Sequence, residues 1–432
     1  MPDAHDAYAA LRNPSYRRLL IGSLLASTGN EMQSVAIGWE LYERTHSAVY
    51  LGLAGLAQFV PMFLLALPAG HMADRFDRKR IVILTQIGMA VTSLGLAAIS
   101  YTAGPVYLVY LFLCCAGTCQ AYSFPARWAL LPGVVSGDEL HNAITWGSSS
   151  WQIASVIGPA VGGLLIAAAR HAQIQHAALN YLLAATCALA CAGLVARVAV
   201  RPAESTREPM SYQSLLRGLR FVWETKPILA TITLDLFSVL LGGATALLPI
   251  FATDILHAGP TGLGWLRAAP SLGALAMALA LAHRPPLRKP GVVLLWAVAG
   301  FGVATIGFGL SHVFWLSFLC LLLTGAFDNI SVVVRGTLVQ VLTPDSLRGR
   351  VTAVTAVFIV SSNELGAFES GITAQLFGPI VSVVGGGIGT MLVVLAVAFT
   401  WPQILRLGAL KPKTQDTSSG QETPVASGRN AL

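Results

Sequence analysis

The chain has 432 residues, of which 55% are hydrophobic and only 11% are charged. A soluble domain carries about 25% charged residues, so soluble globular, disordered and collagen-like proteins are excluded. The composition predicts a polytopic membrane protein. We attribute the net charge of +7 to an excess of Lys and Arg in cytoplasmic loops rather than to a surface that binds nucleic acid.

Continuous apolar stretches follow one another along the chain, each long enough for a membrane-crossing helix of about 20 residues. Twelve are predicted, at 18–42, 48–73, 80–102, 105–126, 139–168, 177–199, 227–252, 261–282, 291–311, 314–336, 347–376 and 380–405. Because these stretches do not alternate with polar residues, membrane β-strands are excluded. The predicted fold is all-α, with twelve transmembrane helices in two pseudo-symmetric six-helix bundles.

The basic residues indicate how the chain is oriented. If both termini are cytoplasmic, 24 of the 27 Lys and Arg residues fall in terminal segments or cytoplasmic loops, and only Arg44, Arg170 and Arg267 lie elsewhere. Cytoplasmic loops of membrane proteins carry an excess of Lys and Arg. We therefore predict a multi-pass protein of the cell (inner or plasma) membrane with cytoplasmic N- and C-termini.

The same pattern divides the chain into segments. We predict an N-terminal arm at 1–17, a six-helix bundle at 18–200, a linker at 201–226, a second six-helix bundle at 227–407 and a disordered tail at 408–432. Within the linker, apolar residues surround Arg217 and Arg220 between positions 212 and 223. This pattern predicts a short amphipathic helix on the cytoplasmic membrane surface.

The two halves share a loop pattern. After the fourth predicted span Arg127 precedes Asp138 by 11 residues, and after the tenth Arg335 precedes Asp345 by 10 residues. The occurrence of this pattern at the same loop of each half indicates an internal duplication.

A specific motif follows the second predicted span, where residues 70–80 read Gly-His-Met-Ala-Asp-Arg-Phe-Asp-Arg-Lys-Arg. A loop that served only to fix the orientation of the chain in the membrane would need the cations, but it would not need the Gly-x-x-x-Asp-Arg sequence with which this motif begins. The motif resembles the loop signature between helices 2 and 3 of the major facilitator superfamily. It matches that signature at Gly70, Asp74, Arg75, Arg78 and Lys79. It departs at Asp77, where the superfamily commonly has glycine.

The resemblance implies a role for this loop. In the superfamily the loop acid, here Asp74, latches the two halves in the outward-facing state by contacting the start of the eleventh helix. That helix is expected to begin near Asp345. We therefore predict that the matching residues 70–79 form a conformational latch.

Two further stretches refine the resemblance. Gly158, Pro159, Gly162 and Gly163 in the fifth span look like the Gly-Pro motif of exporting, antiporter-type branches, although small residues at this spacing also serve ordinary helix packing. The stretch 343–371 resembles the bacterial enterobactin-exporter-like branch. These features favour export over import.

Acidic residues inside the predicted spans are the candidates for proton coupling. An ionised residue at the bilayer centre costs about 2.5–3.5 kcal/mol, so it usually faces a cavity or a partner. The first, seventh and tenth helices line the cavity in the superfamily that the chain resembles, which favours Glu31, Asp235 and Asp328 for proton coupling, with Glu31 as first choice. Interhelical hydrogen bonding without a coupling role is the alternative for each acid. Further cavity candidates are Asn30, Gln33, Trp151, Asn329, Arg335 and Glu364.

No reaction chemistry is predicted. The chain has neither a Walker-type phosphate loop nor a nucleophile–base pair, and its six cysteines fall inside predicted spans without His or carboxylate at ligand spacing. We expect no enzyme activity, cofactor or metal.

The predicted function is secondary active export of a small organic molecule, siderophore- or drug-like, by proton antiport and alternating access. The expected partners are that molecule, protons and membrane lipids, and the protein is expected to be a monomer. An importer or uniporter of the same fold and a transport-inactive membrane receptor are the alternatives.

Overall fold

The computed structural model describes residues 6, 8–171, 177–201, 212–285 and 289–405. Within these residues every regular element is helical. The long helices are α2 (Pro14–Thr45), α3 (Ala48–Arg75), α4 (Arg78–Thr102), α5 (Val106–Leu130), α6 (Gly137–His171), α7 (Ala178–Ala196), α9 (Lys226–Leu241), α11 (Gly259–Ala282), α12 (Pro290–Leu310), α13 (Phe314–Leu342), α14 (Asp345–Phe377) and α15 (Pro379–Thr400). The short elements are α1 (Ala9–Arg12), η1 (Leu131–Gly133), α8 (Tyr212–Glu224), η2 (Ala244–Leu247), α10 (Leu248–Ile250) and η3 (Phe251–Ile255).

The helices agree with the predicted spans. In the part of the chain that the structure describes, eleven helical segments are long and apolar enough to cross a membrane. The first predicted span forms α2, which has 32 residues but a more polar composition. The all-α, membrane-spanning fold predicted from composition is confirmed.

The seventh predicted span departs from the expectation of a continuous helix. Helix α9 ends at Leu241, and Gly242 and Gly243 separate it from the short elements η2, α10 and η3. A β-carbon on Gly243 would lie 2.7 Å from the carbonyl oxygen of Gly366 in α14. Glycine allows this close approach and weakens a helix at the same time, which explains the break.

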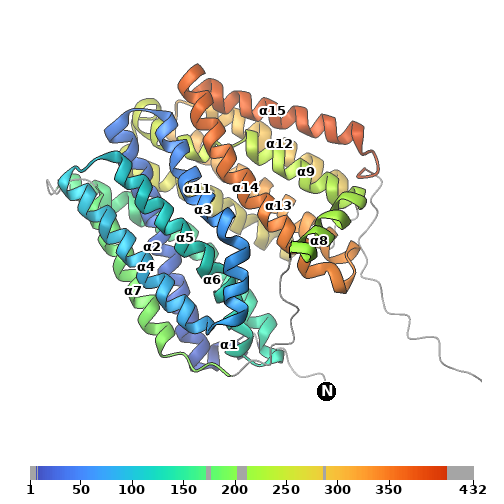
Figure 1. Ribbon diagram of the computed structural model, residues 1–432. Helices are drawn as coiled ribbons and strands as arrows, with labels where there is room; N and C mark the ends of the chain where they lie inside the picture. The colour runs from blue at the N-terminus through green and yellow to red at the C-terminus, as the bar shows by residue number, and fades with distance from the viewer. Residues whose placement is uncertain (1–5, 7, 172–176, 202–211, 286–288, 406–432) are drawn as a thin grey trace, which may run out of the picture.

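The helices form two groups that meet along two contacts (Figure 1). In the first, α2 packs on α6 and α7, and α5 packs on α3 and α4. In the second, α13 packs on α11 and α12, and α9 packs on α14 and α15. The groups touch where α6 meets α11 and where α3 meets α14.

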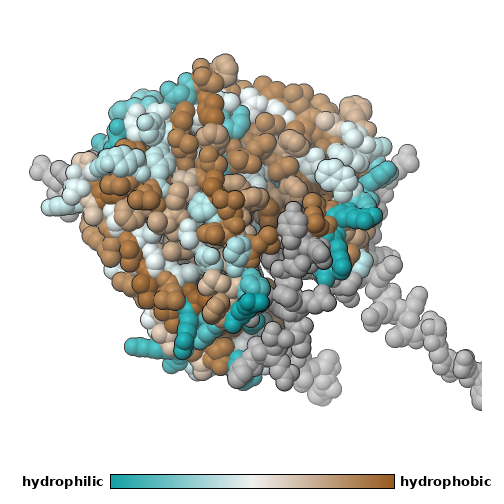
Figure 2. All heavy atoms as spheres, viewed as in Figure 1, coloured by the Kyte–Doolittle hydropathy of each residue, from teal (hydrophilic) through white to brown (hydrophobic). Residues whose placement is uncertain are grey.

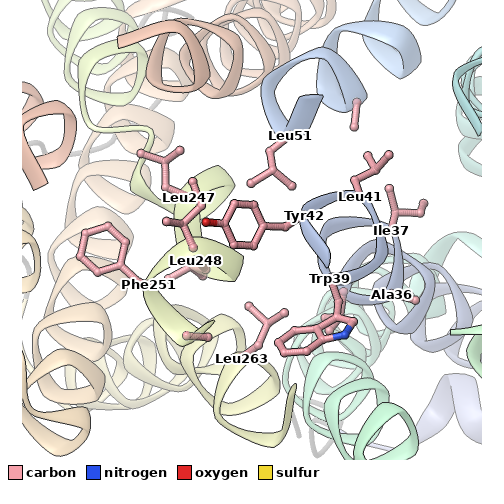
Figure 3. Packing of buried hydrophobic residues seen from close by; sticks show 14 of the residues in the cluster. Ala36, Ile37, Trp39, Leu41, Tyr42, Leu51, Leu247, Leu248, Phe251 and Leu263 are labelled. Atoms are coloured by element: carbon pink, nitrogen blue, oxygen red, sulfur yellow. The ribbon is translucent and has the colours of Figure 1, made fainter. Parts of the chain in front are cut away.

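The core between the two groups is apolar (Figure 3). Tyr42 of α2 and Leu51 of α3 pack with Leu248, Phe251 and Leu263 of the second group in one buried cluster. These residues lie near the end of the molecule where α2 ends and α3 begins. We call this the closed end, and the opposite end, which carries the loop after α3, the basic end.

Large apolar side chains also cover the outside of the molecule. Phe399 is 83% exposed, and Trp296 and Trp315 are each 74% exposed. Figure 2 shows hydrophobic residues across most of the visible face, with hydrophilic residues gathered toward its margins. A continuous apolar surface of this size is typical of contact with lipid.

The predicted linker helix is present as α8. Its Val222 is buried against Val351 and Val354 of α14, while Trp223 is exposed. An apolar contact on one side and an exposed aromatic ring on the other fit the predicted amphipathic character. Its location on a membrane surface stays a prediction, and residues 202–211 of the linker and the predicted tail at 408–432 lie outside the described residues.

Candidate functional site

A cavity of about 570 Å³ lies within the first helix group. Its lining runs along α2 from Tyr16 to Gln33, a rise of about 26 Å at 1.5 Å per residue. At the basic end Trp128 and Leu131 border it. The volume falls in the range of small-molecule sites, about 300–1,000 Å³.

The predicted residues of α2 meet in this cavity. Asn30, Glu31 and Gln33 all line it. The side-chain oxygen of Asn30 accepts a hydrogen bond from Nε2 of Gln120 at 3.2 Å, and Ser93 Oγ donates to Gln33 Oε1 at 2.5 Å. Neighbouring helices thus hold the two amides in place beside Glu31.

Aromatic rings and one cation form the other part of the lining. Trp151, a predicted cavity residue, is 59% exposed and lines the cavity. Phe124 and Trp128 make an edge contact with ring centroids 6.5 Å apart. Arg127 lines the same space, although the sequence analysis treated it only as an orientation signal and as part of the repeat.

The acids of the second helix group lie elsewhere. Asp235 and Asp328 line a pocket of about 10 Å³ with Ser238 and Phe327. That volume is about one water molecule. Neither acid is among the residues that line the cavity around Glu31 in this conformation, so their role in proton coupling stays a prediction.

Arg335 contacts an acid of the small pocket without lining the pocket itself. It forms an ion pair with Asp235 of α9, and the two side chains are only 5% and 8% exposed. Arg335 lies seven residues after Asp328 on α13, but its ion pair runs across helices to α9. Asn329 does not line the large cavity, and its side-chain oxygen is buried without a hydrogen-bond partner in the described part of the chain.

Glu364 of α14 lies at the seam between the groups. A β-carbon on Gly55 of α3 would lie 2.5 Å from its Oε2 atom. Nearby, Arg267 of α11 donates from Nη2 to Ser34 Oγ of α2 at 2.6 Å. The sequence analysis passed over Arg267, although a cation inside a predicted span was a usable signal.

The Gly-Pro motif of the fifth predicted span uses two faces of α6. A β-carbon on Gly158 would lie 2.5 Å from Cβ of Glu31, and one on Gly162 would lie 3.2 Å from Cα of Met32. These two glycines admit α2. Gly163 faces the other group, where its β-carbon would lie 2.9 Å from Cα of Gly264. Pro159 also contacts Gly264, because a β-carbon on Gly264 would lie 2.5 Å from the carbonyl oxygen of Pro159.

The cations of the loop motif bind helix ends. Arg78 donates to the carbonyl oxygens of Ala73 at 3.2 Å and Ala129 at 2.9 Å, and Lys79 Nζ donates to that of Val198 at 2.8 Å. Cations are favourable at the carbonyl ends of helices. These contacts tie α3, α5 and α7 together at the basic end.

The remaining motif residues are placed as follows. Gly70 is buried in α3, and Arg75 is exposed. Asp77, where the motif departs from the superfamily, accepts a hydrogen bond from the Lys79 backbone nitrogen at 2.9 Å and so caps α4. The side chains of Asp74 and Asp345 lie outside the described residues, so the latch contact stays a prediction.

Comparison with known proteins gives the family. The profile of the transmembrane secretion effector family matches residues 5–423. The enterobactin exporter of Shigella boydii is 25% identical over 410 residues, which cover 94% of this chain and 96% of that protein.

Solved structures share the fold. A bacterial homologue of the human lysosomal transporter Spinster, in an inward-facing and occupied conformation, superposes with a TM-score of 0.73 at 14% identity, covering 95% of this chain and 100% of that one. The nucleoside transporter NupG superposes with a TM-score of 0.66 at 12% identity, covering 91% and 99%. The chain belongs to the transmembrane secretion effector family of the major facilitator superfamily.

Proposed function

We propose that the protein is a secondary active exporter that moves a small organic molecule outward in exchange for protons by alternating access. The observation that carries this proposal is the cavity of about 570 Å³ that holds Glu31 in its wall, in a molecule whose helix groups touch near the other end. An exporter needs such a chamber, together with a group that can gain and lose a proton inside it.

The contacts at the closed end support one step of the cycle. Tyr42 of α2 donates a hydrogen bond to Asp254 of η3, and Ser47 Oγ donates to Gln375 of α14 at 2.9 Å. With both termini in the cytoplasm, as the basic residues favour, this end faces outward. The conformation is then the one in which substrate enters from the cytoplasm.

The cavity lining supports a substrate with an apolar or aromatic body and several hydrogen-bonding groups. Phe124, Trp128 and Trp151 offer ring faces, and Asn30 and Gln120 offer amides. The named relative is an enterobactin exporter, so iron-free enterobactin is a reasonable first probe. A single positive charge crossing about 100 mV releases about 2.3 kcal/mol, which is enough for nearly fiftyfold accumulation at about 1.4 kcal/mol per decade.

Everted membrane vesicles that contain the protein test the proposal. With an acidic interior, radiolabelled iron-free enterobactin should accumulate inside, and Glu31→Gln should abolish accumulation while the protein remains folded. Glu43→Gln is the matched control, because Glu43 lies in the same helix outside the cavity lining. Accumulation by Glu31→Gln at the wild-type level would remove Glu31 from the mechanism.

The same vesicles separate the alternatives. Uptake that requires an alkaline interior would indicate import. Saturable binding of the probe without gradient-driven flux or counterflow would indicate a receptor.

A further inference from the structure

Residues that join the two helix groups follow regular stripes on α2 and α11. Ser34, Gly38 and Tyr42 are four residues apart on α2, and their partners in the second group are Arg267, Pro249 and Asp254. Residues at this spacing share one helix face. This face of α2 therefore forms part of the seam that shuts the closed end.

Arg267 lies within the matching face of α11. Gly264, three residues before it, lies against Gly163, and the carbonyl oxygen of Ser271, four residues after it, accepts a hydrogen bond from Gln152 Nε2 at 2.7 Å. Arg267 itself donates to Ser34 Oγ. The backbone contacts on either side fix this arginine at the seam, so its position depends on how the two groups are docked.

Acids from opposite groups flank the seam at this cation. Glu31 is three residues before Ser34, the hydrogen-bond partner of Arg267, hence on the same face of α2. Glu364 reaches the seam from α14, where a β-carbon on Gly55 of α3 would lie 2.5 Å from its Oε2 atom. Other titratable or charged side chains on this side of α2 are Cys187 of α7, which lies against Gly29 behind the cavity, and Arg127 of α5, which lines the same cavity as Glu31.

We propose that Arg267 is a positioning residue that couples the protonation of Glu31 to opening of the closed end. This inference rests on the proposed function and assigns its coupling step. While the closed end is shut, Ser34 holds the guanidinium about one helical turn from Glu31. Its positive charge favours the carboxylate, so a proton on Glu31 leaves into the cavity. When the groups separate there, α11 carries Arg267 away from α2, and Glu31 takes up a proton from the newly opened side.

Protonation should act in the reverse direction as well, because linkage is reciprocal. A protonated Glu31 no longer attracts Arg267, so acid should favour separation of the groups at the closed end. One linked proton changes the ratio of open to shut molecules by at most about tenfold per pH unit.

Spin labels at the closed end can measure that ratio without any transported substrate. Tyr101 of α4 and Val313 before α13 are 69% and 59% exposed on different helix groups. With the six cysteines replaced and labels at these two positions, pulsed dipolar spectroscopy on the full chain in lipid nanodiscs should show a longer distance on acidification. Arg267→Gln should abolish this pH dependence, and Arg267→Lys should retain it.

Two further variants make the result decisive. Arg170→Gln, which removes an arginine of α6 that pairs with Glu43 at 3.7 Å, should keep the wild-type pH profile. Glu31→Gln should populate the long distance at every pH. A pH profile in Arg267→Gln equal to that of the wild type, or no pH response in the wild type, would overturn the inference. Failed transport of enterobactin with an intact distance response would instead count against the proposed function alone.

Discussion

The two helix groups use the same positions for different tasks. Arg127 and Arg335 occupy equivalent places in the internal repeat, and seven residues before them stand Gln120 and Asp328. In the first group the arginine and the glutamine line a wide cavity. In the second the arginine is buried in an ion pair with Asp235, and the acid lines a pocket about the size of one water.

This difference shows what keeps a cavity open inside a helix bundle. Neutral amides such as those of Gln120 and Asn30 need only one another and water, so the helices that carry them can stand apart. A buried cation and carboxylate must stay in contact, because separating them would leave each charge uncompensated at low dielectric. The second group is therefore held together as a body, and the first contains the wide cavity.

The largest expected effect comes from forcing the two groups apart where they touch. Gly163→Val should abolish transport and lengthen the distance between labels at the closed end, because the new side chain would strike the backbone of α11 at Gly264 and Pro260. Gly193→Ala is the control, since nothing lies within 4 Å of the β-carbon there. Normal transport by Gly163→Val would mean that this contact is dispensable.

The ion pair of the second group offers the next test. Arg335→Leu should destabilise the protein by about 3–5 kcal/mol, because Asp235 would remain buried without a partner. Arg127→Leu should cost far less, since Arg127 borders an open cavity. Thermal unfolding in detergent compares the two variants. If Asp235→Asn combined with Arg335→Leu were no more stable than Arg335→Leu, the buried charge would not be the cause.

How much the sequence could predict depends on how far apart along the chain the interacting residues are. Apolar length located the spans because membrane crossing depends on consecutive residues, and Gly158 to Gly163 were found because they resemble a motif that is local in the sequence. The break after Leu241 was missed, since a Gly-Gly pair in an apolar run does not reveal that α14 approaches there.

The charged sites show more clearly which contacts could not be predicted from the sequence. Glu31 was placed at the cavity because it is an acid within the first predicted span, which lines the cavity in the superfamily that the chain resembles, and it lines the cavity here. The pairing of Arg335 with Asp235 joins residues a hundred positions apart, and no periodicity along the chain encodes it. Arg267 carried a readable signal as a cation inside a span, but its partner Ser34 is 233 positions away.

Aromatic residues test whether the first group alone binds substrate. Trp151→Ala should weaken binding of iron-free enterobactin by up to about tenfold, since stacking on one aromatic ring contributes about 0.5–1.5 kcal/mol beyond the area buried. Trp296→Ala is the matched control from the second group, where the ring is 74% exposed on α12 outside the cavity lining. Isothermal titration measures both. Equal loss in the two variants would contradict a site confined to the first group.

The smallest expected effect concerns the third long helix of each group. Helix α4 begins with a side-chain cap from Asp77, whereas α12 begins after Lys289 without one and has Pro290 in its first turn. Asp77→Ala should therefore lower stability by about 1 kcal/mol, and Asp77→Asn, which keeps an acceptor, should recover most of it. Lys289→Ala should leave the unfolding temperature unchanged. If Asp77→Asn lowered the unfolding temperature as much as Asp77→Ala, this loop would require the carboxylate charge rather than the cap. The departure from the superfamily motif at Asp77 would then need an electrostatic explanation.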